Sequence, residues 1–178
     1  MNRPETPQGG TQLAPTLAEI AFALLADGSG GDDSAESVWL ADHAAALASR
    51  PGVAEPRAAL SAWNSAPPVV DRRLHALAVQ QRLGLAETLA LALAREAELL
   101  PMAARALIWL QHPVGEARPT VGLIASLCQR LGVADALPAL ADGPARRHGL
   151  LQLQPDERPL CERSVRVGLP LLFAIDGR

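Results

Sequence analysis

The stretch RPTVGLIASLC, from Arg118 to Cys128, carries the clearest fold signal in the sequence. Pro119 and Thr120 stand where a helix can begin, and the apolar residues that follow recur with the 3.6-residue period of an amphipathic helix. These apolar positions are Val121, Ile124, Ala125, Cys128 and Leu131. A short helix reached by a tight turn from a preceding helix is typical of a helix-turn-helix unit. Such a unit can read DNA, belong to an enzyme or serve as scaffold.

Downstream of this helix, apolar and polar residues alternate instead of following a helical period. The segments LLQLQ (150–154) and SVRV (164–167) both show this period of two, which predicts two half-buried strands. PDERP (155–159) lies between them and predicts the turn of a hairpin. The last apolar segment, LPLLFAI (169–175), predicts a short helix or a buried strand. Helices followed by a two-stranded hairpin give the chain order of a winged helix.

Upstream, helical periodicity interrupted by turn residues predicts further helices. Gly84 is suited to a C-cap, residues 49–66 form a looser stretch, and Pro67-Pro68 mark an internal boundary. The predicted helices cover residues 17–25, 35–48, 70–81, 85 to just before Pro101, and 102–111. The helix that starts at residue 85 presents one apolar stripe, at Leu85, Leu89, Leu93 and Ala97.

We therefore predict a mainly α fold, a helical bundle with a winged-helix-like C-terminal part that consists of a helix-turn-helix and a two-stranded β-hairpin. Three regions are expected along the 178 residues. Residues 1–12 form a disordered arm, 13–66 an N-terminal helical extension and 67–178 a winged-helix-like domain.

The charged residues exclude two kinds of chemistry in this chain. All sixteen cationic residues are arginines. A P-loop needs a lysine to reach the phosphates of a nucleotide, and Schiff-base catalysis needs a lysine amine. Residues 1–99 carry seven arginines against twelve acidic residues, whereas residues 100–178 carry nine against seven. Charge alone does not predict nucleic-acid binding, because domains of that class usually have a clearly basic face.

The sequence nominates no residue for catalysis, for a metal or for a cofactor. It has no nucleophile elbow such as GxSxG, and Cys128 and Cys161 are both expected to be reduced. A polar amino end without a signal peptide, and the lack of an apolar run of about 20 residues, predict a cytoplasmic protein without a membrane segment. The histidines, which lack metal-ligand spacing and are expected on the surface or in turns, are His43, His75, His112 and His148.

The helix of the opening stretch is poorly equipped to read DNA. A recognition helix carries Arg, Lys, Asn or Gln along its exposed face, where these side chains reach base edges in the major groove. Here Gly122, Leu123 and Leu127 occupy such positions. The polar Gln129 and Arg130 lie at the carboxyl end. We expect a packing helix that is buried on two sides.

The tightest basic cluster is ARRHG, at residues 145–149. Arg146 and Arg147 precede the first predicted strand, where they could hold a phosphate backbone or the carboxylates of a partner. A polar turn that leads into a sheet is the plainer interpretation. Together with the start of the opening helix, this cluster gives a candidate partner-binding rim. The rim comprises Arg118, Thr120, Arg146, Arg147 and His148.

Four segments, in this order, carry a resemblance to a known family. They are LAETLALALAREAEL (85–99), RPTVGLIASLC (118–128), RRHGLLQLQ (146–154) and VRVGLPLLFAIDG (165–177). This order is similar to the amino-terminal region of bacterial AAA-type ATPases that accompany contractile, phage-tail-like injection systems. The resemblance spans about residues 74–177. It departs from the family at Ala86-Glu87-Thr88, where a Ser-Pro-Phe-like start is usual.

The resemblance implies a helical, winged-helix-like region that precedes an ATPase core. ATP and magnesium would then bind in a C-terminal module absent from this chain, and the chain would hold no cofactor itself. It would be an amino-terminal domain, excised or independently expressed.

Our leading hypothesis is a non-catalytic recognition or assembly domain that binds a protein partner or a neighbouring ATPase subunit. The alternative is a nucleic-acid-binding winged helix, and a small enzyme ranks third. The cations available for nucleic acid would be Arg118, Arg146, Arg147, Arg158, Arg163 and Arg166.

Overall fold

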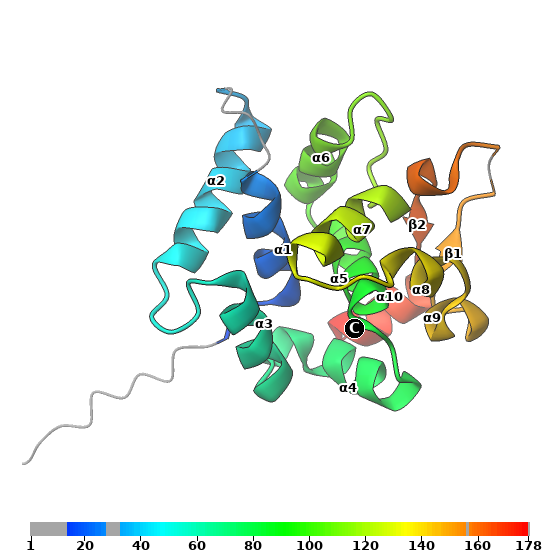
Figure 1. Cartoon of the computed structure of the whole chain (residues 1–178), viewed down its shortest axis with the longest axis horizontal. Coiled ribbons are helices and arrows are strands. Elements are labelled where there is room, and N and C mark those ends of the chain that lie inside the picture. Colours follow the sequence, from blue (N-terminus) through cyan, green and yellow to red (C-terminus); the bar gives the residue numbers. More distant parts are fainter. Residues whose placement is uncertain (1–13, 28–32, 156, 178) are drawn as a thin grey trace, which may run out of the picture.

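The computed structural model describes residues 14–27, 33–155 and 157–177, so the arm predicted at residues 1–12 lies outside the described residues. The described chain is mainly helical, with a small two-stranded sheet near its carboxyl end (Figure 1). The helices are α1 (Leu17–Ala26), α2 (Ala35–Ala48), α3 (Pro56–Ser65), α4 (Arg72–Gln81), α5 (Leu85–Leu99), α6 (Pro101–Leu110), α7 (Val121–Arg130), α8 (Ala136–Asp142), α9 (Pro144–Arg147) and α10 (Leu169–Asp176). Two 3-10 helices, η1 (Val69–Asp71) and η2 (Leu160–Glu162), and two strands, β1 (Gln152–Leu153) and β2 (Val165–Arg166), complete the order.

Helix α5 forms the centre of the molecule. Every side chain from Ala86 to Arg95 is buried, and α1, α4, α6, α7 and α8 all contact this helix. The single apolar stripe predicted for it was therefore too narrow, because α5 is covered on all sides. Alternating alanine and leucine between Leu89 and Ala94 allows neighbouring helices to approach it closely.

Hydroxyl side chains begin three of the helices. Thr16 accepts a hydrogen bond from the Glu19 amide at 3.0 Å, and the Glu19 carboxylate accepts one from the Thr16 amide at 2.7 Å. This reciprocal pair is a capping box at the start of α1. Ser34 and Thr120 cap α2 and α7 in the simpler way, through the amide three residues later. The predicted starts of these helices are confirmed.

The junction between α4 and α5 differs from the prediction. Arg82, with φ of 53°, takes the left-handed conformation that ends α4. Gly84, expected at that position, instead has an extended backbone and is the N-cap of α5. Its amide donates to Glu87 Oε2 at 2.8 Å, which is the half of a capping box that a glycine, having no side chain, can still make.

The sequence did not predict α3, α8 and α9. Helix α3 lies within the stretch interpreted as looser; it begins at Pro56 and buries only Ala59 and Trp63. Helix α8 likewise buries only Ala136 and Leu140. A pair of apolar residues spaced by four is too short a pattern to establish a helical period, so tertiary contacts decide these helices.

The predicted hairpin is present in a shorter form. Strands β1 and β2 pair antiparallel, with Gln152 opposite Arg166 and Leu153 opposite Val165. An isolated bridge joins Thr120 to the residue before β2, so the start of α7 lies against the hairpin. Of the two structures left open for the last apolar segment, the helix, α10, is the one formed.

A glutamine side chain organises the connection between α6 and α7. Gln111 is buried, and its amide nitrogen donates to the carbonyls of Leu107, Glu116 and Arg118. Its amide oxygen accepts from the Thr120 amide at 2.7 Å. One side chain therefore bonds to four backbone groups, which lie in α6, in the irregular connection and at the start of α7.

A buried ion pair joins the amino-terminal helices to α5. Asp71 and Arg95 are 0% and 1% exposed, and Arg95 Nη2 lies 2.8 Å from Asp71 Oδ1. The other oxygen of Asp71 accepts from the Leu17 amide and from Trp63 Nε1, each at 2.7 Å. Arg95 also donates to Glu96 at 2.9 Å. Burial lowers the pKa of the guanidinium, but Asp71 and Glu96 outweigh it and hold the Arg95 pKa above its ordinary value.

The core is continuous across the boundary predicted at Pro67-Pro68. Helix α1 packs on α5 and on α7, and one cluster of buried apolar residues includes members from both sides of the two prolines. In Figure 1, α1 lies directly against the central helix rather than in a separate body.

We expect Asp71→Ala to lower the free energy of unfolding by about 3–5 kcal/mol, because it leaves Arg95 buried without its partner. It also removes the acceptor of two buried donors. Urea denaturation followed by circular dichroism measures the change.

Two further variants complete this test. Asp142→Ala is the matched control, because Asp142 is 85% exposed and reaches Arg147 only at 3.7 Å; its stability should stay unchanged. Replacing both charges, in Asp71→Leu with Arg95→Met, should cost less than Asp71→Ala alone. Equal stability of Asp71→Ala and the control would contradict the assigned role.

Candidate functional site

The predicted rim is divided between two places in the structure. Arg118 forms an ion pair with Glu98 at 2.6 Å. Thr120 is 5% exposed, and its hydroxyl is used as the cap of α7. Both belong to the end of the α6–α7 connection, whereas the other rim residues belong to α9 and the residue after it. Figure 1 shows α9 below the two strands and the end of that connection above them.

The residues at α9 are the more accessible part of the rim. Arg147 is 60% exposed and lies 3.7 Å from Asp142, and His148 is exposed as well. Arg146 is half-buried, and within the described ranges its Nε is a buried nitrogen without a hydrogen-bond partner. These three residues could contact a partner together, but Arg118 and Thr120 are committed to internal bonds.

Helix α7 packs as the sequence predicts for a helix with little groove-reading capacity. Leu127 is buried and Leu123 is half-buried, while Gln129 and Arg130 are exposed at the carboxyl end. Arg130 donates to the Leu24 carbonyl of α1. Its principal polar side chain is thus used inside the molecule.

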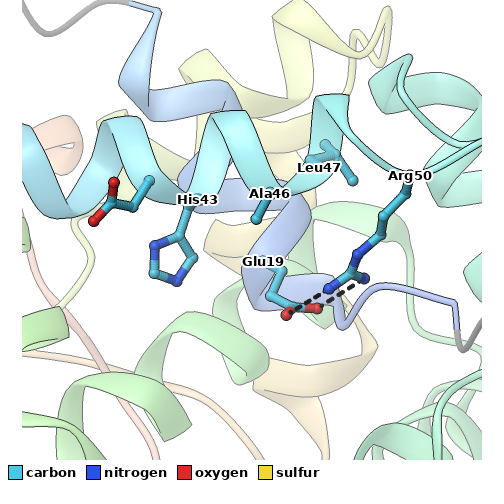
Figure 2. Close-up of a pocket in the computed structure, with 6 residues that line it drawn as sticks. Glu19, His43, Ala46, Leu47 and Arg50 are labelled. Carbon is cyan, nitrogen blue, oxygen red and sulfur yellow. Dashed lines mark hydrogen bonds and ion pairs between the residues drawn. The ribbon is translucent and has the colours of Figure 1, made fainter.

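A groove between α1 and α2 brings charged groups and an imidazole ring together. It has a volume of about 250 Å³ and takes Glu19 from α1 and Asp42, His43, Ala46, Leu47 and Arg50 from α2 and its C-terminal end. Figure 2 shows His43, Ala46, Leu47 and Arg50 along one side of the groove. Glu19 faces Arg50 from the other side.

A second hollow of about 290 Å³ continues from the first, because Glu19 and His43 line both. It runs over α1 towards the junction of α5 and α6. We call the two hollows together the α1–α2 groove. The residues that line only the second hollow are Thr16, Ala18, Phe22, Trp39, Val70, Arg95, Glu96 and Leu100.

Two of the charged groups in the groove neutralise one another. The Glu19 carboxylate lies 3.0 Å from Arg50 Nη2, and a second bond from Arg50 reaches its other oxygen at 3.4 Å. Glu19 also accepts the Thr16 amide of the capping box. This pair fixes the end of α2 against the start of α1, and each group neutralises the charge of the other.

Aromatic rings form one wall. The Trp39 ring centroid is 4.8 Å from that of Phe22 and 4.1 Å from that of His43. His43 Nδ1 lies 2.9 Å from the Trp39 carbonyl, and since a carbonyl only accepts, Nδ1 carries a proton. In the neutral ring, Nε2 is then an acceptor, and no bond to it is formed within the described ranges.

Capacity to accept hydrogen bonds remains at three points of the groove. Asp42 makes no hydrogen bond or ion pair with any residue in the described part of the chain, and Glu96 uses only one of its carboxylate oxygens, on Arg95. With His43 Nε2, these groups are acceptors. The groove therefore suits a ligand that donates hydrogen bonds.

The sequence did not single out this groove. His43 was expected on the surface or in a turn, whereas it is half-buried against Trp39 and Phe22. The only local signal was the spacing of four residues between Trp39 and His43, which places both rings on one face of a helix. Glu19 and Arg50 are 31 positions apart, and nothing in the local pattern indicates that they meet.

The described residues contain neither a metal-binding cluster nor a membrane-spanning helix. No group of three or more His, Cys, Asp or Glu residues in the described ranges is arranged to hold a metal ion. Among the helices of the same ranges, none is both long enough and apolar enough to cross a membrane.

Both cysteines are free, as predicted. Cys128 is buried in α7, and burial raises the pKa of its thiol to about 11. Because the thiolate is the nucleophile, Cys128 is unreactive at neutral pH. Cys161, in η2, is exposed.

Comparison with protein-family models, with curated proteins and with solved structures gives no match.

The thiols provide a direct check on the packing of α7. At pH 8 we expect an aromatic disulfide reagent to modify one thiol per folded chain rapidly, and Cys161→Ser to abolish this fast phase. Both thiols should react in denaturant. Two fast thiols in the folded protein would contradict the burial of Cys128.

Raising the pH gives a second expectation from the same group. The Cys128 pKa is raised on folding, so above pH 9 the unfolded chain loses this proton first and the folded state loses stability up to about pH 11. Cys128→Ala should remove this contribution to the decline in urea denaturation midpoints between pH 8 and pH 10.

Proposed function

We propose that this chain is a non-catalytic recognition or assembly domain that binds a protein partner. The observation that carries the proposal is the α1–α2 groove, where unused acceptors lie beside exposed apolar side chains. Val70 and Leu100, on the lip of the groove, are 47% and 46% exposed. An apolar lip around a few unsatisfied polar groups is the composition of a protein-binding surface.

We further propose that the carboxyl-terminal part is winged-helix-like. The chain order α6, α7, α8 and then the β1–β2 hairpin is that of a winged helix. The bridge from Thr120 to Ser164 supports it, because a short extended segment before the second helix pairs with the hairpin in such domains. Helix α8 would then occupy the recognition-helix position.

The resemblance to the amino-terminal region of AAA-type ATPases of contractile injection systems supports an assembly role. By that resemblance, ATP hydrolysis with magnesium belongs to a separate C-terminal module, and the partner is another injection-system protein or a neighbouring ATPase subunit. A cytoplasmic location is part of the same proposal.

Internal ion pairing disfavours nucleic acid as the partner. Arg118 pairs with Glu98, and Arg158 pairs with Glu116 at 2.7 Å. Helix α8 carries no arginine, and its exposed residues include Leu137 and Pro138. Phosphate-dominated binding needs several free cations on one face.

To test partner binding, the intact chain is immobilised and challenged with purified injection-system components, with size-exclusion chromatography and light scattering on any complex. We expect at least one component to form a stoichiometric complex. Consistently empty captures under cross-linking would count against the proposal.

One observation favours the nucleic-acid alternative: Arg166 is exposed on β2 and makes no ion pair in the described chain. An electrophoretic titration with duplex DNA and single-stranded RNA at 50 and 200 mM salt separates the two functions. We expect no shift up to about 10 µM protein at either salt concentration. A protein that binds nucleic acid non-specifically would usually give a shift there, because its dissociation constant falls in that range. A shift at low salt that Arg166→Ala weakens would favour the alternative.

A further inference from the structure

We propose that the α1–α2 groove binds a basic side chain, arginine or lysine, that a partner protein presents next to an apolar residue. This inference rests on the proposed function and names the chemistry of the partner. Its carrying observation is that two carboxylates with free oxygens, Asp42 and Glu96, line the groove beside aromatic rings and an apolar lip.

The ionisable groups that face the groove leave a negative balance. They are Glu19, Asp42, His43, Arg50, Arg95 and Glu96. Both arginines are engaged: Arg50 with Glu19, and Arg95 with Asp71 beneath the groove. The carboxylates of Asp42 and Glu96 retain free oxygens, so an incoming cation meets attraction.

The hydrogen-bonding chemistry of the free acceptors in the groove favours the same ligand, a basic side chain. Arginine and lysine side chains only donate hydrogen bonds, whereas carboxylate oxygens and a neutral imidazole nitrogen accept them. Charge-assisted bonds of this kind are about twice as strong as neutral ones. A phosphate or a carboxylate would instead be repelled by the charges of Asp42 and Glu96.

The aromatic wall adds a second attraction for a cation. Trp39 is half-buried, and its ring lies in the second hollow beside Glu96. A cation within about 6 Å of an indole is attracted by the negative face of the ring. The methylene stem of the same side chain can pack on Val70 and Leu100, and a neighbouring apolar residue can cover the rest of the lip.

The probe for this inference is a random 12-residue peptide library displayed on phage and selected against the full chain. The best peptide is synthesised with a fluorescent label and titrated by anisotropy. We expect enriched peptides to pair Arg or Lys with an adjacent apolar residue. Replacing that basic residue by its neutral isostere, citrulline for arginine or norleucine for lysine, should weaken binding about tenfold or more.

Variants of the groove locate the binding. Asp42→Asn removes a carboxylate that makes no internal bond in the described chain, so the variant keeps the fold. It should weaken peptide binding about tenfold. Leu100→Ala, which truncates an exposed apolar side chain of the lip, should weaken peptide binding as well. Asp142→Asn, which changes another exposed aspartate, on α8, is the matched control and should leave the affinity unchanged. Circular dichroism confirms that each variant is folded.

Enriched peptides without a basic residue, no enrichment at all, or equal affinity of wild type and Asp42→Asn would overturn the inference. Failure here is distinguishable from failure of the proposed function. A purified component captured equally well by wild type and by the Asp42→Asn and Leu100→Ala variants leaves partner binding intact and removes the groove as its site. Empty captures remove both.

Discussion

The fold depends on the contact between Asp71 and Arg95. A carboxylate and a guanidinium that water does not reach are tolerable only when nearly every hydrogen-bonding group on them is used, and here they are. Asp71 takes the first amide of α1, the indole of Trp63 in α3 and the guanidinium of α5. Three helices from distant parts of the chain must therefore meet at one geometry, because any other arrangement leaves a buried charge unpaired.

A second buried carboxylate acts in the same way at the other end of α5. Glu87 is 1% exposed and accepts from the Gly84 amide at its own helix start and from the Ala145 amide at the start of α9. The close approach requires a glycine at 143, where a Cβ atom would lie 2.5 Å from Glu87 Oε1. One side chain thus fixes both the entry to the central helix and the position of α9.

Much of the local structure could be predicted from the sequence, and the long-range structure could not. Helices with a capping hydroxyl and a long apolar period, such as α1 and α2, were found at nearly their observed bounds, and the hairpin was found because its two segments alternate. Helices α3 and α8 were missed because they carry only two buried residues each. The roles of Asp71 and Arg95 could not be predicted, since their charges indicate exposure unless the partner, 24 positions away, is known. The α1–α2 groove escaped prediction for the same reason, as its walls come together only when α1, α2 and α5 have packed.

The burial of α5 from Ala86 to Arg95 has a consequence for how the molecule opens. Helices that precede Pro67-Pro68 and helices that follow them both cover α5. Neither part of the chain therefore retains a complete core when the other part unfolds. Local openings that expose the α5 amides to hydrogen exchange must then require nearly the free energy of global unfolding. Helix α2, whose outer face is exposed, can open locally at a much lower free energy. In this sense the protein is a single cooperative unit. A displacement of the amino-terminal helices acts directly on α5, the helix against which α7 and the hairpin pack.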